Sequence, residues 1–249
     1  MLIPAGNPSL WTGPTGTNTY LLPGRVPAIV DAGVGDARHV AAVEAALGGR
    51  ALELVLLTHG HVDHASGVPA LIARWPAANV RPSSSPLVDG ESLAAGDSAL
   101  IALFTPGHAP DHFCFFDEEL RDVYCGDLLR AGGTVVIPAS RGGDLRAYLE
   151  SLRRVRDLRP RRLLPGHGPV IEEPEALIAQ YLAHRAQREV QVVDALRRGH
   201  GAPEDMVTDI YGSLPSGLVA AAADSVLAHL KKLEADGVAE QAGGRWKLR

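Results

Sequence analysis

Three histidines and one aspartate gather in a single short stretch of the chain. Residues 58–64, Thr-His-Gly-His-Val-Asp-His, follow the apolar run 54–57, which is typical of a buried strand, and Gly60 marks the start of a loop. Imidazole nitrogen and carboxylate oxygen are ligands that suit Zn²⁺, and a catalytic zinc site also keeps a position open for water. This spacing is far more demanding than a lone histidine, so it predicts a metal site in preference to a solvated loop.

Three further side chains that can bind a metal follow later apolar runs. His108, Asp127 and His167 each stand just past a predicted strand and beside a glycine, which allows the backbone to approach closely. Either of these histidines, taken alone, could equally be a structural one. Together with residues 58–64 they complete a set of candidate ligands at strand ends: His59, His61, Asp63, His64, His108, Asp127 and His167.

These candidates divide into two metal sites that share one carboxylate. We expect one site with three nitrogens, from His59, His61 and His108. The second site includes a carboxylate and is made by Asp63, His64 and His167. Asp127 would bridge them. Two Zn²⁺ ions about 3.5–4 Å apart can share a water, lower its pKa toward about 7 and polarise an electrophile. We therefore expect two Zn²⁺ per chain, with manganese or iron as alternatives. The catalytic roles fall to Asp63 and Asp127, without a serine or cysteine nucleophile.

Residues near the ligands are candidates for supporting roles. Asp31 ends a predicted strand and His112 follows a ligand stretch, so each could orient a ligand from behind. The alternatives are a strand-end cap for Asp31 and ordinary structural hydrogen bonding for His112. Arg141 and Arg146 begin a stretch, 141–162, that holds eight arginines against three acids. They are candidate substrate contacts because a basic strip could hold the phosphates of RNA, although a solvated helix face would have the same composition.

Length and composition limit the class of protein. The 249 residues suffice for one large domain, or for one domain with a small appendage. A formal net charge of −5 argues against nucleic-acid binding by overall charge alone. Cys114 and Cys125 lie in apolar runs and are predicted to be buried free thiols. The first residues lack a basic segment and no apolar run is long enough to span a bilayer, so we expect a soluble, cytoplasmic protein with no membrane partner.

The order of predicted elements up to residue 174 indicates a layered sandwich of the α/β (α+β) class. A hairpin, a helix, a strand and a second helix are expected at 19–30, 36–47, 53–57 and 67–75. Short antiparallel strands, a helix and a last strand follow at 99–104, 112–116, 121–124, 144–156 and 162–164. Two mixed sheets with helices outside them, an αββα sandwich, account for both halves. We therefore expect a catalytic domain at 1–174.

Beyond residue 174 the chain is rich in helix-forming residues. Helices predicted at 175–198, 204–211 and 216–235, followed by a hairpin at 238–248, make 175–249 a winged-helix-like domain. The first helix should bury one stripe, made by Leu177, Ile178, Tyr181, Leu182, Val190, Val193 and Leu196. Balanced charge makes this domain a poor generic DNA binder. We expect it to cover an edge of the active site or to build a homodimer; the alternative is a ligand-sensing regulator that binds nucleic acid.

Taken together, these motifs resemble the metallo-β-lactamase fold superfamily over nearly the whole chain. The resemblance rests on residues 16–20, 30–33, 58–64, 105–108, 126–127 and 165–168. It implies the αββα fold, metal-dependent hydrolysis and ligand roles for the metal-binding candidates named above. Residues 181–185 and 227–246 look most like the lactamase-β-like 2 group, whose members carry a winged helix and whose animal members are endoribonucleases that act on single-stranded RNA.

The resemblance and the arginine strip make endoribonuclease-like phosphodiester hydrolysis the expected reaction, on single-stranded RNA or on a small molecule. A thioester, a lactone, a glyoxalase-II-type substrate or, weakly, a β-lactam would use the same ligands and need only a different pocket. True metallo-β-lactamases lack an aspartate at the position of Asp127, which argues against antibiotic hydrolysis as the main activity. The endoribonucleases carry a bulky residue where this chain has Gly60, and that glycine is expected to open the pocket floor.

Overall fold

Two five-stranded sheets form the larger part of the protein in the computed structural model, which describes residues 1–249. The first sheet has the order β1-β2-β3-β4-β5, with β1 Leu2–Pro4, β2 Asn18–Leu22, β3 Ala28–Val30, β4 Leu54–Leu56 and β5 Asn79–Arg81. The second has the order β10-β9-β8-β7-β6, with β6 Ser92–Ala95, β7 Ser98–Phe104, β8 Phe113–Asp117, β9 Asp122–Gly126 and β10 Arg162–Pro165. The first sheet mixes antiparallel and parallel pairs, and in the second only β9 and β10 are parallel.

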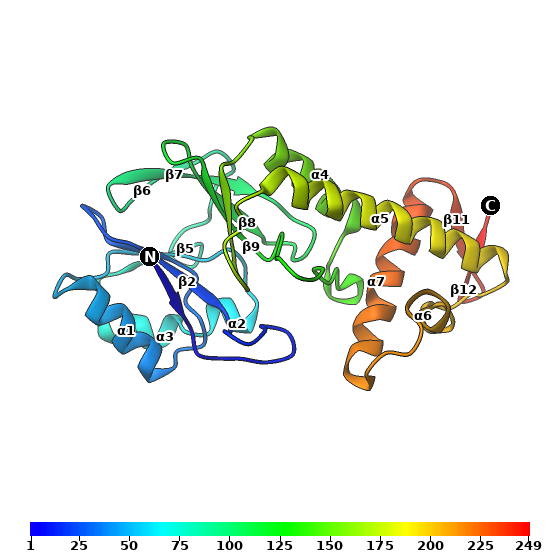
Figure 1. The fold of residues 1–249 in the computed structure, drawn as a ribbon, viewed down its shortest axis with the longest axis horizontal. Helices are drawn as coiled ribbons and strands as arrows, with labels where there is room; N and C mark the ends of the chain where they lie inside the picture. Colours follow the sequence, from blue (N-terminus) through cyan, green and yellow to red (C-terminus); the bar gives the residue numbers. More distant parts are fainter.

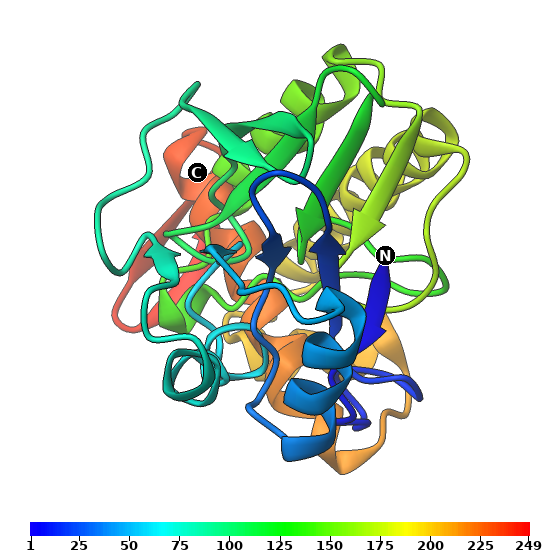
Figure 2. The same ribbon diagram turned by 90° about the vertical axis from the view of Figure 1, so that its left-hand side faces the viewer.

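Helices cover the outer face of each sheet (Figures 1 and 2). The first sheet is covered by α1 Ala37–Leu47, α2 Val62–Ala65 and α3 Val68–Arg74. The second is covered by α4 Leu145–Asp157 and by the first part of α5 Pro174–Arg197. This arrangement confirms the predicted αββα sandwich.

Alternating side chains in the strands build the layers. In β2, Tyr20 and Leu22 lie between the two sheets while Leu21 packs against the helices of the first layer. In β8, Phe115 lies between the sheets and Phe116 belongs to the core beneath α4 and α5. Successive side chains of a strand point to opposite faces. Each of these strands is therefore buried on both sides and contributes to two cores.

The predicted helix starts at residues 36 and 144 and the predicted buried thiols are confirmed. Asp36 caps α1 by accepting from two backbone N–H groups, at 2.8 and 3.3 Å. Asp144 caps α4 in the same way, with one bond of 2.9 Å. Each side chain thereby satisfies N–H groups that have no partner inside the helix. Cys114 and Cys125 are buried, free thiols in the core of the second sheet.

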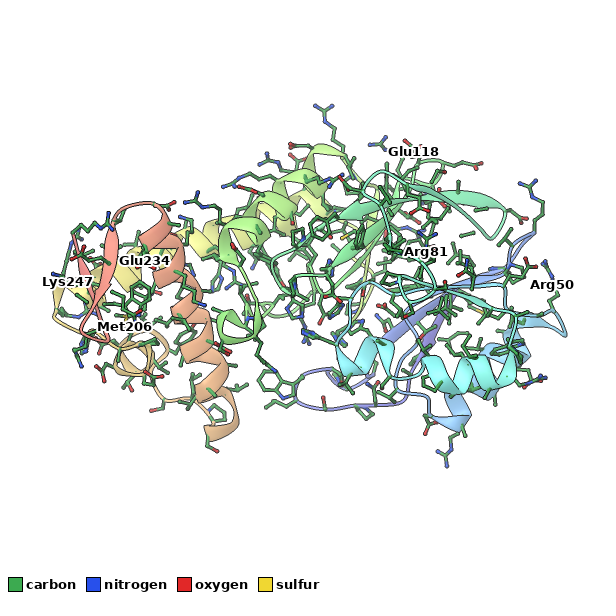
Figure 3. The ribbon with its side chains drawn as sticks, turned by 180° about the vertical axis from the view of Figure 1, so that it is seen from behind. Arg50, Arg81, Glu118, Met206, Glu234 and Lys247 are labelled. Atoms are coloured by element: carbon green, nitrogen blue, oxygen red, sulfur yellow. The ribbon has the colours of Figure 1, made fainter.

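The C-terminal part is built around the second half of α5. It adds α6 Pro203–Tyr211, α7 Ser216–Ala235, and an antiparallel hairpin of β11 Ala239–Ala242 and β12 Arg245–Leu248. Its own core includes Val192, Leu196, Met206, Val226, Leu230 and Trp246, and Figure 3 shows Met206 inside this part of the molecule. None of the helices is by itself long and apolar enough to cross a membrane; α6 and α7 pass that test only as a pair, bent by 111°.

The buried face of α5 differs from the predicted stripe. Ile178 and Tyr181 are buried as expected, but Val190 is 60% exposed and Arg185 only 3% exposed. The first half of this helix packs on the sandwich and the second half on α6, α7 and the hairpin. A helix of 24 residues with two different partners changes its buried face along its length, so one stripe does not describe it. The domain boundary between residues 174 and 175 falls at the start of α5 and stays a prediction.

Ending the chain after Pro174 should give aggregated or insoluble protein. Ile178 and Tyr181 of α5 and Ala228 of α7 complete the core of the second sheet, so the shortened chain would expose a contiguous apolar surface. Size-exclusion chromatography of the purified 1–174 fragment measures this. A soluble, monomeric and fully active fragment would instead show that residues 175–249 form an independent domain.

Candidate metal centre

Loops at one edge of the sandwich carry the candidate ligands. The loop after β4 and the short helix α2 supply four of them, and one each follows β7, β9 and β10; in chain order they are His59, His61, Asp63, His64, His108, Asp127 and His167. Their ligand atoms lie within 4.8 Å of one another in three overlapping groups: His59, His61 and His108; His59, His64 and Asp127; and Asp63, His64 and His167. The structure therefore brings all seven predicted ligands together, and it draws them from both sheets.

Three ring nitrogens converge in the all-histidine group. His61 Nδ1 lies 2.9 Å from His59 Nε2 and 3.0 Å from His108 Nε2. The other ring nitrogen of His108 donates to the Val136 carbonyl at 2.8 Å, and that of His59 lies 3.0 Å from the Thr58 hydroxyl. Because a carbonyl only accepts, neutral His108 carries its proton on Nδ1 and presents a lone pair at Nε2. His59 Nε2 and His108 Nε2 thus both present lone pairs to His61 Nδ1, which can donate a proton to only one of them, so the group fits a metal ion.

The second group combines two imidazoles with a carboxylate. His167 Nε2 lies 3.3 Å from His64 Nε2 and 3.2 Å from Asp63 Oδ2. Asp31 Oδ2 accepts from His64 Nδ1 at 2.7 Å, which directs the other nitrogen of His64 into the group. Burial lowers the pKa of His167, but hydrogen bonds with Asp127 and Asp63 raise the pKa of this side chain to about 9. The group therefore attracts positive charge, as a metal site must.

Asp127 faces both groups. Its Oδ1 lies 3.5 Å from His64 Nε2 and 3.3 Å from His167 Nε2, and its Oδ2 lies 3.6 Å from His108 Nε2. Burial opposes ionisation of this carboxyl, but the neighbouring His64 and His167 hold its pKa well below the usual range. A bridging carboxylate requires one oxygen on each side, and the His and Asp clusters are consistent with a dinuclear metal site.

Asp31 holds two ligands from behind. It is 2% exposed and accepts from the backbone N–H of Thr58 at 2.8 Å, in addition to its bond with His64. The Thr58 hydroxyl lies 3.0 Å from both oxygens of Asp31, so it donates to the carboxylate and accepts from His59. This series of hydrogen bonds fixes the protons of His59 and His64 on the ring nitrogens that face away from the metal centre. The sequence did not single out Thr58, although it directly precedes His59.

His112 lies behind the bridging residue. Its Nε2 accepts from the backbone N–H of Asp127 at 3.2 Å, and its Nδ1 lies 2.9 Å from the Thr105 hydroxyl. Burial lowers the pKa of His112 to about 3, so the ring is neutral and keeps the lone pair that accepts this bond. The contact fixes the backbone from which the Asp127 carboxylate extends.

Gly60 does not open the pocket floor as expected. Its backbone N–H donates to Asp111 Oδ2 at 2.9 Å, and a Cβ atom placed on this glycine would lie 2.9 Å from the same oxygen. The carboxylate of Asp111 therefore takes up the space that a side chain at residue 60 would need. The two residues are 51 positions apart, so the contact could not be read from the sequence.

Asn18 is a further residue that the sequence did not identify as functional. Its side-chain amide donates to the Pro165 carbonyl at 2.9 Å and to the Gly168 carbonyl at 2.8 Å, on either side of His167. The turn that presents this ligand is thus tied to the first sheet. An amide at the start of a fully buried strand is the signal that would have found it.

The two arginines proposed as substrate contacts lie outside the ligand cluster. Arg146 forms an ion pair with Asp236 at the end of α7. Arg141 is exposed in the short 3₁₀ helix Ala139–Arg141. Neither side chain contacts a metal-ligand candidate, and their assignment to a substrate stays a prediction.

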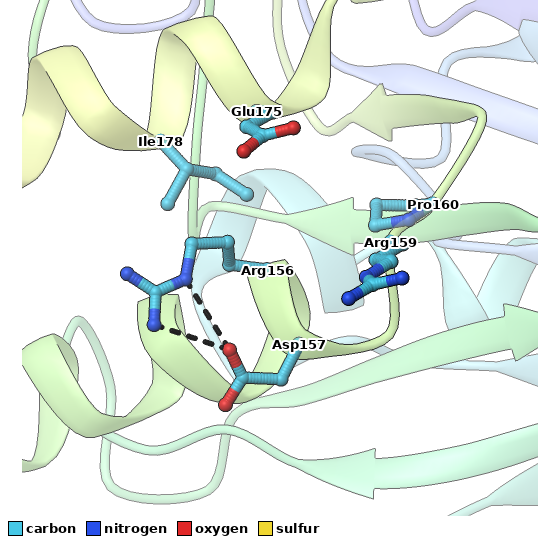
Figure 4. A pocket seen from close by; sticks show the side chains of 6 residues that line it. All are labelled: Arg156, Asp157, Arg159, Pro160, Glu175 and Ile178. Carbon is cyan, nitrogen blue, oxygen red and sulfur yellow. Dashed lines mark hydrogen bonds and ion pairs between the residues drawn. The ribbon is translucent and has the colours of Figure 1, made fainter.

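A separate pocket of about 430 Å³ lies between α4 and α5 (Figure 4). Its lining residues are Arg156, Asp157, Arg159, Pro160, Glu175 and Ile178. It sits before the start of β10, whereas His167 follows the end of that strand. The pocket is therefore at the opposite end of the sheet from the candidate metal centre.

Comparison with known proteins agrees with this geometry. Residues 12–85 and 78–167 match the family model of the metallo-beta-lactamase superfamily, and residues 202–246 match the beta-lactamase associated winged helix domain. The chain is 34% identical to the atrochrysone carboxyl ACP thioesterase of Aspergillus fumigatus, over 81% of this chain and 70% of that protein. It is 31% identical to the beta-lactamase-like protein 2 homolog of Caenorhabditis elegans, over 90% of this chain and 81% of that one.

A solved structure of a metallo-beta-lactamase family protein from Thermus thermophilus has the same fold. The TM-score is 0.80 at 24% identity, and the match covers 100% of this chain and 98% of that one. The resemblance inferred from the sequence motifs is thereby confirmed, including the winged helix. The chain belongs to the metallo-β-lactamase superfamily, as a metal-dependent hydrolase that carries the β-lactamase-associated winged helix at its C-terminal end.

Proposed function

We propose that this protein hydrolyses thioesters of apolar acyl groups with two Zn²⁺ ions held by the seven candidate ligands. The observation that carries the proposal is the combination of this nitrogen-rich centre with 34% identity, over 81% of the chain, to a protein named as an ACP thioesterase. When bound, the two ions would lower the pKa of a water and polarise the acyl carbonyl. Zinc is the proposed metal because imidazole and carboxylate donors suit it.

The hydrogen bonding of the centre favours a leaving group that departs without a proton. His59, His64 and His108 use one nitrogen as a candidate ligand and the other in a hydrogen bond. They are therefore not free to protonate a leaving group. A thiol has a pKa of about 8.5, so a thiolate departs more readily unprotonated than the alkoxide that RNA cleavage releases.

The buried thiols do not compete as nucleophiles. Burial raises the pKa of Cys114 to about 12, and it raises the pKa of Cys125 well above the usual range. Both cysteines are fully buried in the core of the second sheet. Because the thiolate is the reactive form, neither side chain supplies a covalent route.

The loop between β1 and β2 supports an apolar acyl group. Leu10 is 65% and Trp11 48% exposed at the tip of this loop. At its base the Thr17 hydroxyl lies 3.4 Å from Asp63 Oδ2, and at its tip the Trp11 carbonyl accepts from Arg130 at 2.8 Å. The loop thus extends from the candidate metal centre toward α7 (Figure 1). Its exposed apolar side chains suit a hydrophobic substrate better than a phosphate backbone.

RNA receives less support from the arginine strip than its composition suggests. Carboxylates within 4.0 Å neutralise four of the arginines: Arg146, Arg154, Arg156 and Arg162 pair with Asp236, Asp89, Asp157 and Asp122. Arg141 and Arg153 are exposed and remain candidates for phosphate contacts. We retain single-stranded RNA as the rival substrate for the test.

A substrate panel with the metal-replete protein tests the proposal. Acyl-coenzyme A thioesters of increasing chain length should be hydrolysed with kcat/KM values that rise with chain length, while a lactone, a β-lactam and single-stranded RNA are turned over more slowly. Elemental analysis of the same sample should give two zinc equivalents. Removing the metal with a chelator should stop the reaction, and adding Zn²⁺ should restore it.

The Arg141→Ala, Arg153→Ala double variant, which removes the two exposed candidates for phosphate contacts, separates the two substrate classes. Hydrolysis of a thioester that carries no phosphate should be unchanged, because the carbonyl reacts at the metal centre and not at these cations. Cleavage of RNA by the wild type in preference to every thioester, lost at low salt in the double variant, would overturn the proposal in favour of phosphodiester hydrolysis.

A further inference from the structure

Helix α5 contacts the segment 128–136, which runs from the candidate ligand Asp127 to the residue that hydrogen-bonds the candidate ligand His108. This segment, residues 128–136, begins directly after Asp127 and ends at Val136, whose carbonyl accepts from His108 Nδ1 at 2.8 Å. It contains no helix or strand. Its course must therefore be fixed by side chains from elsewhere in the fold.

The start of this segment is held by two tyrosines. The Tyr181 hydroxyl of α5 accepts from Arg130 N at 3.2 Å and donates to the Arg130 carbonyl at 2.8 Å. The Tyr148 hydroxyl of α4 donates to the Leu128 carbonyl at 2.8 Å. These bonds fix the backbone within three residues of Asp127, the carboxylate that faces both ligand groups.

The end of the segment is held by Arg185 of α5. Its guanidinium donates to the Thr134 hydroxyl at 3.0 Å and also to the Val135 carbonyl. The group lies 5.4 Å from the centre of the Tyr148 ring. The next carbonyl along the chain is that of Val136, which sets the proton position and the direction of the His108 ring.

Burying the charged side chain of Arg185 costs free energy, which a residue that only filled space would not require. The side chain is 3% exposed and forms no ion pair with a carboxylate, and its Nε has no hydrogen-bond partner. A buried charge without an opposite charge lowers stability unless its hydrogen bonds compensate. An apolar side chain would fill this position at lower cost, but it could not hold the Val135 carbonyl.

We propose that Tyr181 and Arg185 are positioning residues of the metal centre, which act through residues 128–136 on Asp127 and His108. The first half of α5, which precedes the winged helix, thereby takes part in metal binding without supplying a ligand. The inference holds for any substrate, because it concerns the geometry of the ligands and not the acyl group.

The test compares Arg185→Met with Arg188→Met in the full chain. Arg188 stands on the same helix, stacks 3.9 Å from the centre of the Tyr211 ring and donates to the Ile210 carbonyl at 3.1 Å, so it makes similar contacts entirely within the C-terminal part. Zinc affinity is measured by competition with a chromophoric chelator, and ligand geometry by the visible spectrum of the Co²⁺-substituted protein. We expect Arg185→Met to weaken the zinc affinity of at least one site by up to about 10-fold and to change the spectrum, because Arg185 acts on His108 through one further residue, and loss of a group that bonds a ligand directly costs about 10–100-fold. Arg188→Met should keep both at the wild-type values.

Two milder variants keep the test decisive if Arg185→Met fails to fold. Tyr181→Phe removes only a hydroxyl and should shift the zinc affinity in the same direction. Arg185→Lys keeps the charge but replaces the planar guanidinium, which holds both Thr134 and Val135, with a single ammonium, so its zinc affinity should fall below the wild-type value by less than in Arg185→Met. Wild-type zinc affinity and an unchanged cobalt spectrum in folded Tyr181→Phe and Arg185→Lys or Arg185→Met proteins would overturn the proposal. An equal loss of zinc affinity in Arg188→Met would also overturn the proposal, because it would show that the loss comes from general destabilisation of the protein.

Discussion

Replacing Asp127 with alanine should lower hydrolysis by more than about 100-fold and leave the protein with fewer than two metal equivalents. Loss of a group that only supports a ligand typically costs about 10–100-fold, and this carboxylate faces both candidate sites directly. Without it, the His64 and His108 nitrogens lose the negative charge that lies between the two groups. Elemental analysis after gel filtration and kcat/KM for a thioester measure the two effects.

The matched control for this change is Asp89→Ala. Asp89 pairs with Arg154 on the surface and has a half-exposed side chain, so its removal deletes a carboxylate outside the centre. Circular dichroism should show that both variants keep the fold. Two full metal equivalents and wild-type activity in the Asp127→Ala protein would refute the bridging role.

Changing Asp31 to asparagine should weaken zinc binding by about 10–100-fold with only a modest loss of stability. Asparagine keeps the shape and tolerates the left-handed backbone of this residue, whose φ is 64°. The amide, however, has only one accepting oxygen for Thr58 and His64. If its NH₂ group faces His64 Nδ1, the proton of that ring moves to Nε2 and occupies the lone pair that a metal needs. Chelator competition measures the affinity, and urea unfolding of the metal-free protein measures the stability.

Asp122→Asn provides the comparison for Asp31→Asn. Asp122 is also 2% exposed, but it pairs with Arg162 at the start of β9, away from the ligands. Its substitution should lower the free energy of unfolding by about 1–3 kcal/mol, the cost of weakening its charge-assisted hydrogen bonds with Arg162, and leave the zinc affinity unchanged. If Asp31→Asn behaves in the same way, then Asp31 supports the fold and not the metal centre.

The local signals in the sequence were sufficient for the ligands and for the longer elements. Residues 58–64 combine four donors next to an apolar run, and Asp36 and Asp144 mark helix starts that the structure contains. Such signals depend only on residues that are close together in the sequence, so they can be recognised without knowledge of the fold. The αββα architecture followed because helices and strands of sufficient length have a recognisable period.

Short elements and distant contacts were not accessible in this way. The strands β1, β5 and β6 and the helix α2 have only three or four residues each, too few to show a period, whereas the equally short β3 and β4 were marked by their uninterrupted Ala-Ile-Val and Leu-Val-Leu runs. Arg185 interrupts an apolar stripe, but the sequence does not say that its partner is the Val135 carbonyl, 50 positions away. Gly60 looked like open space for the same reason, since its neighbour Asp111 comes from another loop.

Because the ligands are divided between the two sheets, bound metal ions would link the sheets to each other in addition to their part in the reaction. His59 and His61 follow a strand of the first sheet and His108 follows one of the second, and Asp63, His64 and His167 are divided in the same manner. An ion in either site would therefore pin one half of the sandwich to the other along this edge. Because neither half can offer a complete coordination set before the sheets have met, the free energy of metal binding is also free energy of sheet docking. Bound metal would therefore stabilise the assembled sandwich in addition to its part in hydrolysis.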